Sequence, residues 1–211
     1  MNSNNYSAVQ NRRSLKLETF VCLGIALFVA WVPSGEVCAD PGYHVKSGKV
    51  TFNVESNIAF LKVSGSSSVV KGKGEATVAG NAATIQGLRF ELDPKTFKMG
   101  MGLRDEHLYE KVFTAADGSI PPVVLQADRF EAVLNPKTSK WEGMLQARLT
   151  IRGVTKPVSF RASLEKEGNG AVVAAEGNLN TSAFGVKPIT YSGATVNDDV
   201  AVTVSNLRIE P

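Results

Sequence analysis

Hydrophobic and polar residues alternate along most of the chain after residue 40, with the period of two that a strand with one buried face produces. In residues 145–151 (LQARLTI), for example, every second side chain is apolar. Turn-forming residues separate such stretches, as at Asn135–Ser139, Arg152–Pro157 and Gly168–Gly170. We predict eight strands, lying within residues 50–54, 70–78, 88–92, 123–134, 141–151, 158–164, 173–179 and 200–204.

One segment departs from this alternation and has helical spacing. Leu108 and Val112 lie one helical turn apart, and the acidic residues Asp105 and Glu106 suit a first turn. We therefore predict one short helix, Asp105–Val112, whose apolar side caps one mouth of a barrel or packs into the sheet.

The strand pattern indicates an all-β fold. Eight antiparallel strands of this length favour a closed barrel, because closure removes exposed strand edges. A two-sheet sandwich has the same strand count, and the periodicity does not distinguish the two. The chain after residue 39 contains no internal repeat and no linker, so we predict that residues 40–211 form one domain.

The first 39 residues have the layout of a signal peptide. A basic stretch with Arg12 and Arg13 precedes the uncharged apolar run Phe20–Val32, and a small-residue cleavage site ends at Ala39. We predict export to the periplasm or secretion, by the general secretory route ahead of the twin-arginine route. A retained N-terminal anchor is the alternative, although the apolar run is shorter than the roughly 20 residues of a bilayer crossing.

Composition narrows the function classes. Cleavage would remove both cysteines, Cys22 and Cys38, so disulfides and thiolate sites are not expected in the remaining 172 residues. The full chain has 23 basic and 20 acidic residues, and its formal net charge of +3 becomes about +2 without the leader. No basic stripe is present, so we predict no nucleic-acid partner.

Catalytic chemistry has few candidates in this sequence. The only histidines, His44 and His107, lie too far apart along the chain to show a metal-ligand spacing. There is no Gly-x-Ser-x-Gly elbow, and no glycine-rich phosphate loop joins a strand to a helix. We predict no metal site, no cofactor and no enzymatic activity. A hydrolase that uses His107 is the alternative.

The apolar faces of the strands form the main candidate site. They carry Phe52, Val54, Phe90, Leu92, Leu125, Leu149, Phe160 and Leu164. In a small barrel such a face either lines a pocket for a long apolar ligand or fills the interior as a packed core. Periodicity alone favours the packed core, because every barrel shows this pattern.

Several motifs give a resemblance to a known family. The segment Met101–Leu108 (MGLRDEHL), with Phe113 after it, resembles the YceI-like pattern Arg-Asp-x-His-Leu followed by Phe. Pro122–Leu125, Ile151–Val158 (IRGVTKPV) and the Phe184-Gly185 pair resemble further parts of that pattern, over nearly the whole mature chain. The resemblance implies a lipocalin-like, eight-stranded antiparallel barrel, periplasmic or secreted, that holds a polyprenyl or quinone tail and has no catalytic residues.

Two departures from the family pattern concern polar groups. Ser47-Gly48 stands where the family often has a His-Ser pair, and Thr181–Phe184 lacks the Arg and Asp that often precede its Phe-Gly pair. Arg104 and His107 are then the matching polar pair. They either contact the head of a ligand or anchor the helix to a loop.

We therefore predict an exported protein that binds a hydrophobic small molecule or lipid, with a membrane only as the source of that lipid. The alternative is an envelope stress or interaction protein with a packed barrel and no ligand. The sequence does not indicate an oligomeric state. The candidate ligand-binding residues are Phe52, Val54, Phe90, Leu92, Leu103, Arg104, His107, Leu108, Leu125, Leu149, Phe160 and Phe184.

Overall fold

The structure is a computed structural model that describes residues 42–58, 62–191 and 193–211. The predicted signal peptide, residues 1–39, lies outside the described residues. Within the described ranges, no helix has both the length and the apolar composition that a bilayer crossing requires.

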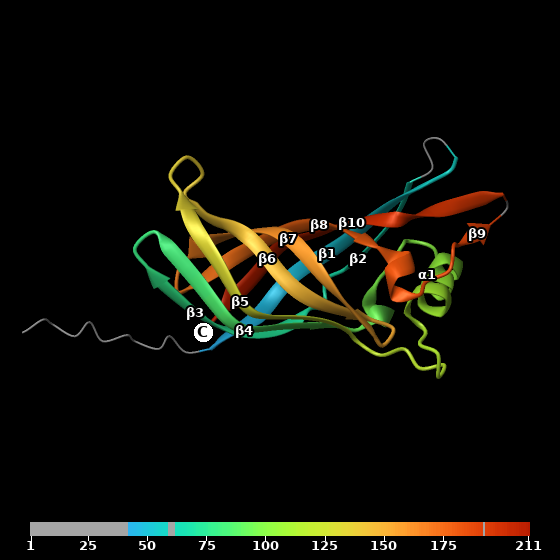
Figure 1. Cartoon of the computed structure of the whole chain (residues 1–211), viewed down its shortest axis with the longest axis horizontal. Helices are drawn as coiled ribbons and strands as arrows, with labels where there is room; N and C mark the ends of the chain where they lie inside the picture. The colour runs from blue at the N-terminus through green and yellow to red at the C-terminus, as the bar shows by residue number, and fades with distance from the viewer. Residues whose placement is uncertain (1–41, 59–61, 192) are drawn as a thin grey trace, which may run out of the picture. The chain divides into compact units, whose positions relative to one another are not determined.

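Eight antiparallel strands close into a barrel (Figure 1). Each strand pairs with the next, and the first and last strands close the ring, with Val50 opposite Val204 and Val54 opposite Val200. This closing pair excludes the two-sheet sandwich and confirms the predicted barrel. The strands are β1 (Tyr43–Ser56), β3 (Lys71–Ala79), β4 (Ala82–Leu92), β5 (Val123–Asn135), β6 (Lys140–Ile151), β7 (Val154–Glu167), β8 (Gly170–Asn180) and β10 (Ala194–Glu210).

Two short strands were not predicted. β2 (Lys62–Ser67) pairs with the second half of β1, from Val50 opposite Ser67 to Glu55 opposite Lys62. Its serine and glycine residues show too little apolar alternation to predict a strand. β9 (Thr190–Tyr191) is a two-residue extension that pairs with β10.

The connection between β6 and β7 is tighter than predicted. Ile151 pairs directly with Val154, so the turn consists of Arg152 and Gly153 alone, and residues 154–157 already belong to β7. Both turn residues have positive φ, 46° and 84°, as a two-residue turn of type I′ requires. An arginine is uncommon at such a position, because its Cβ crowds the backbone there.

The helical segment begins earlier than predicted. α1 spans Gly102–Leu108, and the chain continues into a wider turn, η2 (Tyr109–Phe113), instead of one helix over Asp105–Val112. The start shifts because the Met101 carbonyl accepts hydrogen bonds from the N–H groups of Arg104 and Asp105. Two further short turns, η1 (Pro94–Thr96) and η3 (Thr181–Phe184), lie in the connections.

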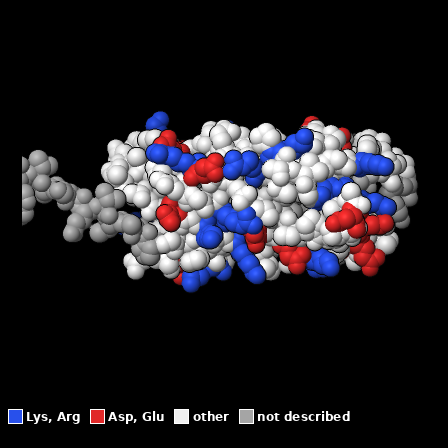
Figure 2. Space-filling model, turned by 60° about the horizontal axis from the view of Figure 1, so that its bottom comes forward, with Lys and Arg blue, Asp and Glu red and all other residues white. Residues whose placement is uncertain are grey.

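The two ends of the barrel differ. Figure 1 shows α1 and β9 at one end, and the β3–β4 and β5–β6 hairpins at the other. On the outer face shown in Figure 2, basic and acidic side chains are interspersed, without a large region of one sign. Many of them pair across neighbouring strands, as Arg148 does with Asp128 and Arg161 with Glu176.

Candidate functional site

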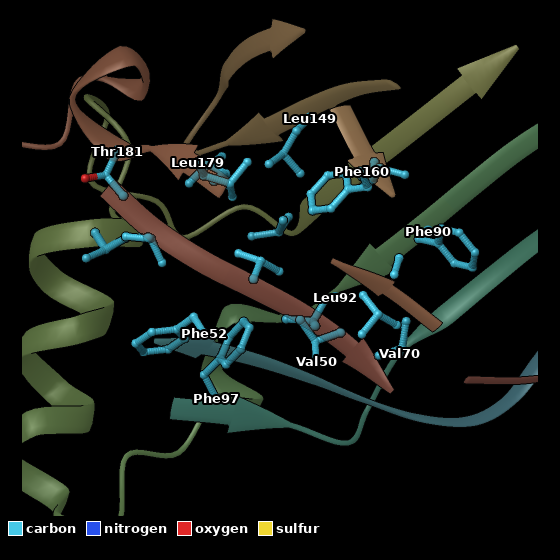
Figure 3. A pocket seen from close by; sticks show the side chains of 18 of the residues that line it. Val50, Phe52, Val70, Phe90, Leu92, Phe97, Leu149, Phe160, Leu179 and Thr181 are labelled. Atoms are coloured by element: carbon cyan, nitrogen blue, oxygen red, sulfur yellow. The ribbon is translucent and has the colours of Figure 1, made fainter. Parts of the chain in front are cut away.

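The barrel interior is hollow. It encloses a cavity of about 690 Å³, lined mainly by apolar side chains from the inward faces of all eight barrel strands (Figure 3). This volume lies within the roughly 300–1,000 Å³ of typical ligand pockets. The side chains of the described barrel therefore do not fill its centre.

Eleven of the twelve candidate ligand-binding residues line this cavity. They are Phe52, Val54, Phe90, Leu92, Leu103, Arg104, His107, Leu108, Leu125, Leu149 and Phe160. The twelfth, Phe184, does not line it: the side chain is 2% exposed and packs into the hydrophobic core. The η3 turn, which the Asn180 side chain caps by accepting a hydrogen bond from Ala183 N, directs Phe184 into that core.

Glycines on neighbouring strands lie against the inward aromatic rings. Gly65 is opposite Phe52, and Gly72 is opposite Phe90. A Cβ added at Gly65 would lie 2.5 Å from Phe52 Cε1, so the ring covers the glycine closely. Each ring therefore lies along the barrel wall instead of crossing the lumen, which helps to keep the cavity open.

The cavity opens beside α1. Most of its exposed lining residues lie in α1 or in connections at that end of the barrel. Lys73, also exposed, lies on β3 and not at that end. Met101 and Leu103 are 56% and 58% exposed, so apolar surface continues from the lumen to the rim. The exposed residues at this end are Ile58, Met101, Leu103, Arg104, Lys187 and Asn197.

A polar cluster holds α1 against the chain that precedes it. The Asp105 carboxylate accepts a hydrogen bond from Met99 N at 2.7 Å and lies 3.6 Å from Lys98 Nζ. The Tyr109 hydroxyl donates towards the carbonyl oxygen of Phe97, at 2.8 Å, and accepts from Lys98 Nζ at 3.0 Å. The Tyr109 hydrogen bond is the main cause that raises the pKa of Lys98, and Asp105 contributes further.

Arg152 joins two other segments at the mouth. Its Nη1 donates to the Lys111 carbonyl, at 3.3 Å, and to the Gly185 carbonyl, at 3.4 Å. The first carbonyl belongs to η2 and the second directly follows η3. These contacts give a reason for an arginine at a turn position that favours asparagine or glycine.

Arg104 and His107 both face the cavity, from successive turns of α1. The Arg104 side chain is exposed and forms no hydrogen bond or ion pair with any described residue, so it does not anchor the helix. Asp105 and Tyr109 perform that anchoring. The structure thus removes the anchoring interpretation for Arg104 and leaves its guanidinium at the mouth.

The two histidines lie in different surroundings. His44 is exposed on β1, where it pairs with Lys73 and Glu210, so it lies in regular sheet. It does not line the main cavity, whereas His107 does. Across the described ranges, no three His, Cys, Asp or Glu residues are close enough together to hold a metal ion.

Several lining residues lie in segments where hydrophobic and polar residues do not alternate regularly. Phe97 and Met99 come from the connection between η1 and α1, and Lys187 from the connection after η3. Phe97 packs edge-on against Phe52, with ring centroids 5.6 Å apart, and stacks on Phe113. β10 contributes Val200 and Val202 to the lining, and the alternation of β10 could have identified them.

Comparison with known proteins agrees with this architecture. A family model described as YceI-like domain matches residues 43–206. The fold is similar to BcnA of Burkholderia cenocepacia, with a TM-score of 0.57 and 16% identity over 78% of this chain and 96% of that one. It is also similar to a polyisoprenoid binding domain from Saccharophagus degradans implicated in plant cell wall breakdown, with a TM-score of 0.54 and 10% identity over 80% and 97%. No curated protein matches the sequence.

Proposed function

Since the chain belongs to the YceI-like family and its barrel encloses an apolar cavity, we propose that it binds a long-chain lipid of isoprenoid or quinone type. The chain of the lipid lies along the lumen, against residues such as Phe90, Leu149 and Phe160. Arg104 and His107 contact its head at the mouth beside α1.

The open lumen is the observation that carries this proposal. Apolar surface removed from water contributes about 25 cal/mol per Å² to binding, so a cavity lined by aliphatic and aromatic side chains favours an alkyl or prenyl chain. The likeness to a polyisoprenoid binding domain supports the same ligand class. A packed barrel without a ligand does not fit a cavity of about 690 Å³.

The proposed role is binding and not catalysis. The lining of the cavity is mostly aliphatic and aromatic, and its one histidine, His107, lies at the rim with Arg104. We further propose that the protein is exported and acts in the periplasm or outside the cell, on the basis of the signal-peptide pattern in residues 1–39.

A substitution that fills the lumen tests the proposal. Ala175 on β8 lines the cavity, and Ala174 beside it is exposed on the outer face. We expect Ala175→Trp to weaken binding of geranylgeraniol by about tenfold or more, because the indole occupies space that the chain needs. Ala174→Trp is the matched control and should bind like the unchanged protein.

The measurement is a titration of the purified protein, expressed from the full chain, together with organic extraction and mass spectrometry of lipid that co-purifies. The proposal fails if no isoprenoid, quinone or fatty acid binds or co-purifies. It also fails if Ala175→Trp binds as tightly as Ala174→Trp.

A further inference from the structure

We propose that a hollow on the outer wall of the barrel is a binding site for a phosphate group. The hollow has a volume of about 230 Å³ and lies over three neighbouring strands, β1, β3 and β4. This volume is below that of typical ligand pockets, so the hollow suits one small anionic group. The residues that border it are His44, Lys71, Gly72, Lys73, Arg89 and Glu91. Two of these, Lys73 and Glu91, also border the lumen, because β3 and β4 form the wall between the two spaces.

The charged side chains of β1 and β4 at this hollow face away from the lumen. Val45 on β1 lines the lumen, so the preceding His44 faces outward. Phe90 on β4 lines the lumen as well, so Arg89 and Glu91 on either side of it face outward. A ligand in the hollow therefore does not compete with a chain in the lumen, and this proposal does not depend on what the lumen binds.

The pairing of the strands brings the basic side chains together. Lys73 on β3 is directly opposite His44 on β1 and directly opposite Arg89 on β4. Residues opposite each other in neighbouring antiparallel strands have Cβ atoms about 4.5–5.5 Å apart, so these three side chains form one row across the hollow. Lys71 lies two residues before Lys73, and both are exposed, with the half-buried Gly72 between them. Like charges directly opposite each other destabilise a sheet, so an anion bound across the row would relieve a repulsion.

The hollow contains more basic than acidic groups. Among the described residues, Glu91 is the only acidic one that borders it. The Glu91 carboxylate accepts hydrogen bonds from Nε and Nη2 of Arg89, which leaves Nη1 of Arg89 for another acceptor. The side chains of His44, Lys71 and Lys73 form no hydrogen bond or ion pair with a described residue. Two ammonium groups thus face the hollow without a bonded counter-ion.

The acidic residues just outside the hollow do not pair with these lysines. Glu210 at the end of β10 forms its ion pair with Lys46. Glu75 lies further along β3, opposite Gln86 and beyond a bulge in the pairing, and forms no ion pair with a described residue. The hollow therefore keeps a positive excess that attracts an anion.

A phosphate group matches these donors. Its oxygens accept charge-assisted hydrogen bonds from Arg89 Nη1 and from the ammonium groups of Lys71 and Lys73, which surround one space. A free phosphate ion and the phosphate of a lipid head at a membrane surface present the same group to them. The experiment below distinguishes these two sources.

The first arm follows NMR signals of the protein, expressed from the full chain, while inorganic phosphate is added at low ionic strength. We expect the signals of residues 44, 71–73 and 89–91 to shift with one common dissociation constant, which added salt should raise. Lys73→Gln should weaken binding by about threefold to tenfold, because it removes the centre of the row. Glu91→Gln should strengthen binding severalfold, since it removes the acid and frees Arg89, and a folding defect would not produce such a gain.

Lys137→Gln is the matched control, because Lys137 is an exposed lysine in the β5–β6 turn that forms no ion pair with a described residue. It should bind phosphate like the unchanged protein. The second arm measures co-sedimentation with phosphatidylcholine vesicles that contain or lack phosphatidic acid, for the same variants.

Binding of inorganic phosphate with this pattern of variants would support the site and show that the free group is sufficient. Binding only to vesicles with phosphatidic acid, again reduced by Lys73→Gln, would support the site with a lipid head as the source. The proposal is overturned if neither probe binds, if Lys73→Gln behaves like Lys137→Gln, or if Glu91→Gln does not strengthen binding. None of these results bears on lipid binding in the lumen, which the titration with geranylgeraniol tests separately.

Discussion

The side chain of Asp105 connects the helix at the mouth to the segment before it. Its carboxylate accepts the Met99 N–H within a cluster that is largely shielded from water, since Asp105 is only 8% exposed. The nearby Lys98 ammonium is exposed, so solvent screens that ion pair. The bond to the backbone N–H therefore contributes more to the stability of the mouth than the ion pair does.

We expect Asp105→Ala to lower the free energy of unfolding by about 1–3 kcal/mol, because the Met99 N–H would lose its acceptor in a partly dry site. Urea denaturation followed by circular dichroism measures the change. Asp117→Ala is a suitable control, since the Asp117 carboxylate is exposed and accepts its hydrogen bonds from Ser119 in its own turn. Equal stability of the two variants would show that the Asp105 bond has no such role.

The sequence predicts individual site residues well where they belong to regular strands or to the motif that forms α1. Leu125 and Leu149 face the lumen because alternation places them there, and the structure agrees. Phe97 and Lys187 lie in irregular connections, and they reach the cavity only because the whole fold brings those connections over the mouth. The Phe184-Gly185 motif does not indicate which way its ring points.

At the scale of elements, all eight barrel strands are predictable because each has one apolar face over several residues. The helix boundaries are not, since backbone hydrogen bonds to Met101 determine its start and η2 replaces its predicted end. β2 is also not predictable, because small polar residues such as Ser64 and Ser66 carry little pattern. Its strand form comes from pairing with β1.

The pairing of β1 with β2 also shapes the lumen, through the contact between Phe52 and Gly65. The ring lies so close to the glycine that an added methyl group would be 2.5 Å from Cε1 and 3.1 Å from Met99 Cγ. Both neighbours are side-chain atoms, so they can shift. The shift also disturbs the edge-on packing of Phe52 on Phe97.

We expect Gly65→Ala to weaken geranylgeraniol binding by roughly threefold to tenfold and to destabilise the fold by about 1–3 kcal/mol, as overpacking does. The displaced Phe52 ring would enter space that the ligand chain uses. Titration and thermal unfolding measure the two effects. Gly42→Ala is the control, because an added methyl group there meets only the Gly74 oxygen, at 3.8 Å. Unchanged binding by Gly65→Ala would mean that the ring does not border the occupied part of the lumen.

Considered as a whole, the barrel combines a continuous ring with a mouth held by a few contacts. Every barrel strand is hydrogen-bonded on both sides, because β1 and β10 close the sheet. α1 and the adjoining η2, in contrast, are held by hydrogen bonds of Asp105 and Tyr109 and by the packing of Leu108 and Phe113. Segments with fewer stabilising contacts open locally at a lower free energy than the core strands do.

This difference predicts the pattern of hydrogen exchange. We expect amides in the middle of β6, near Leu145 and Leu149, to exchange only through global unfolding, and amides of α1 to exchange about a hundredfold faster or more. Saturating geranylgeraniol should slow exchange in α1, because a ligand that fills the lumen contacts Leu108 and binds the closed mouth more tightly than the open one.

Mass spectrometry of peptic fragments, at two pH values to confirm that opening is at equilibrium, provides the measurement. The β3–β4 hairpin at the opposite end is the internal control, since the ligand should protect it less than α1. Equal protection of α1 and β6 without ligand would show that the mouth is as stable as the ring. A lipid would then have to enter through the mouth as it stands, without local opening of α1.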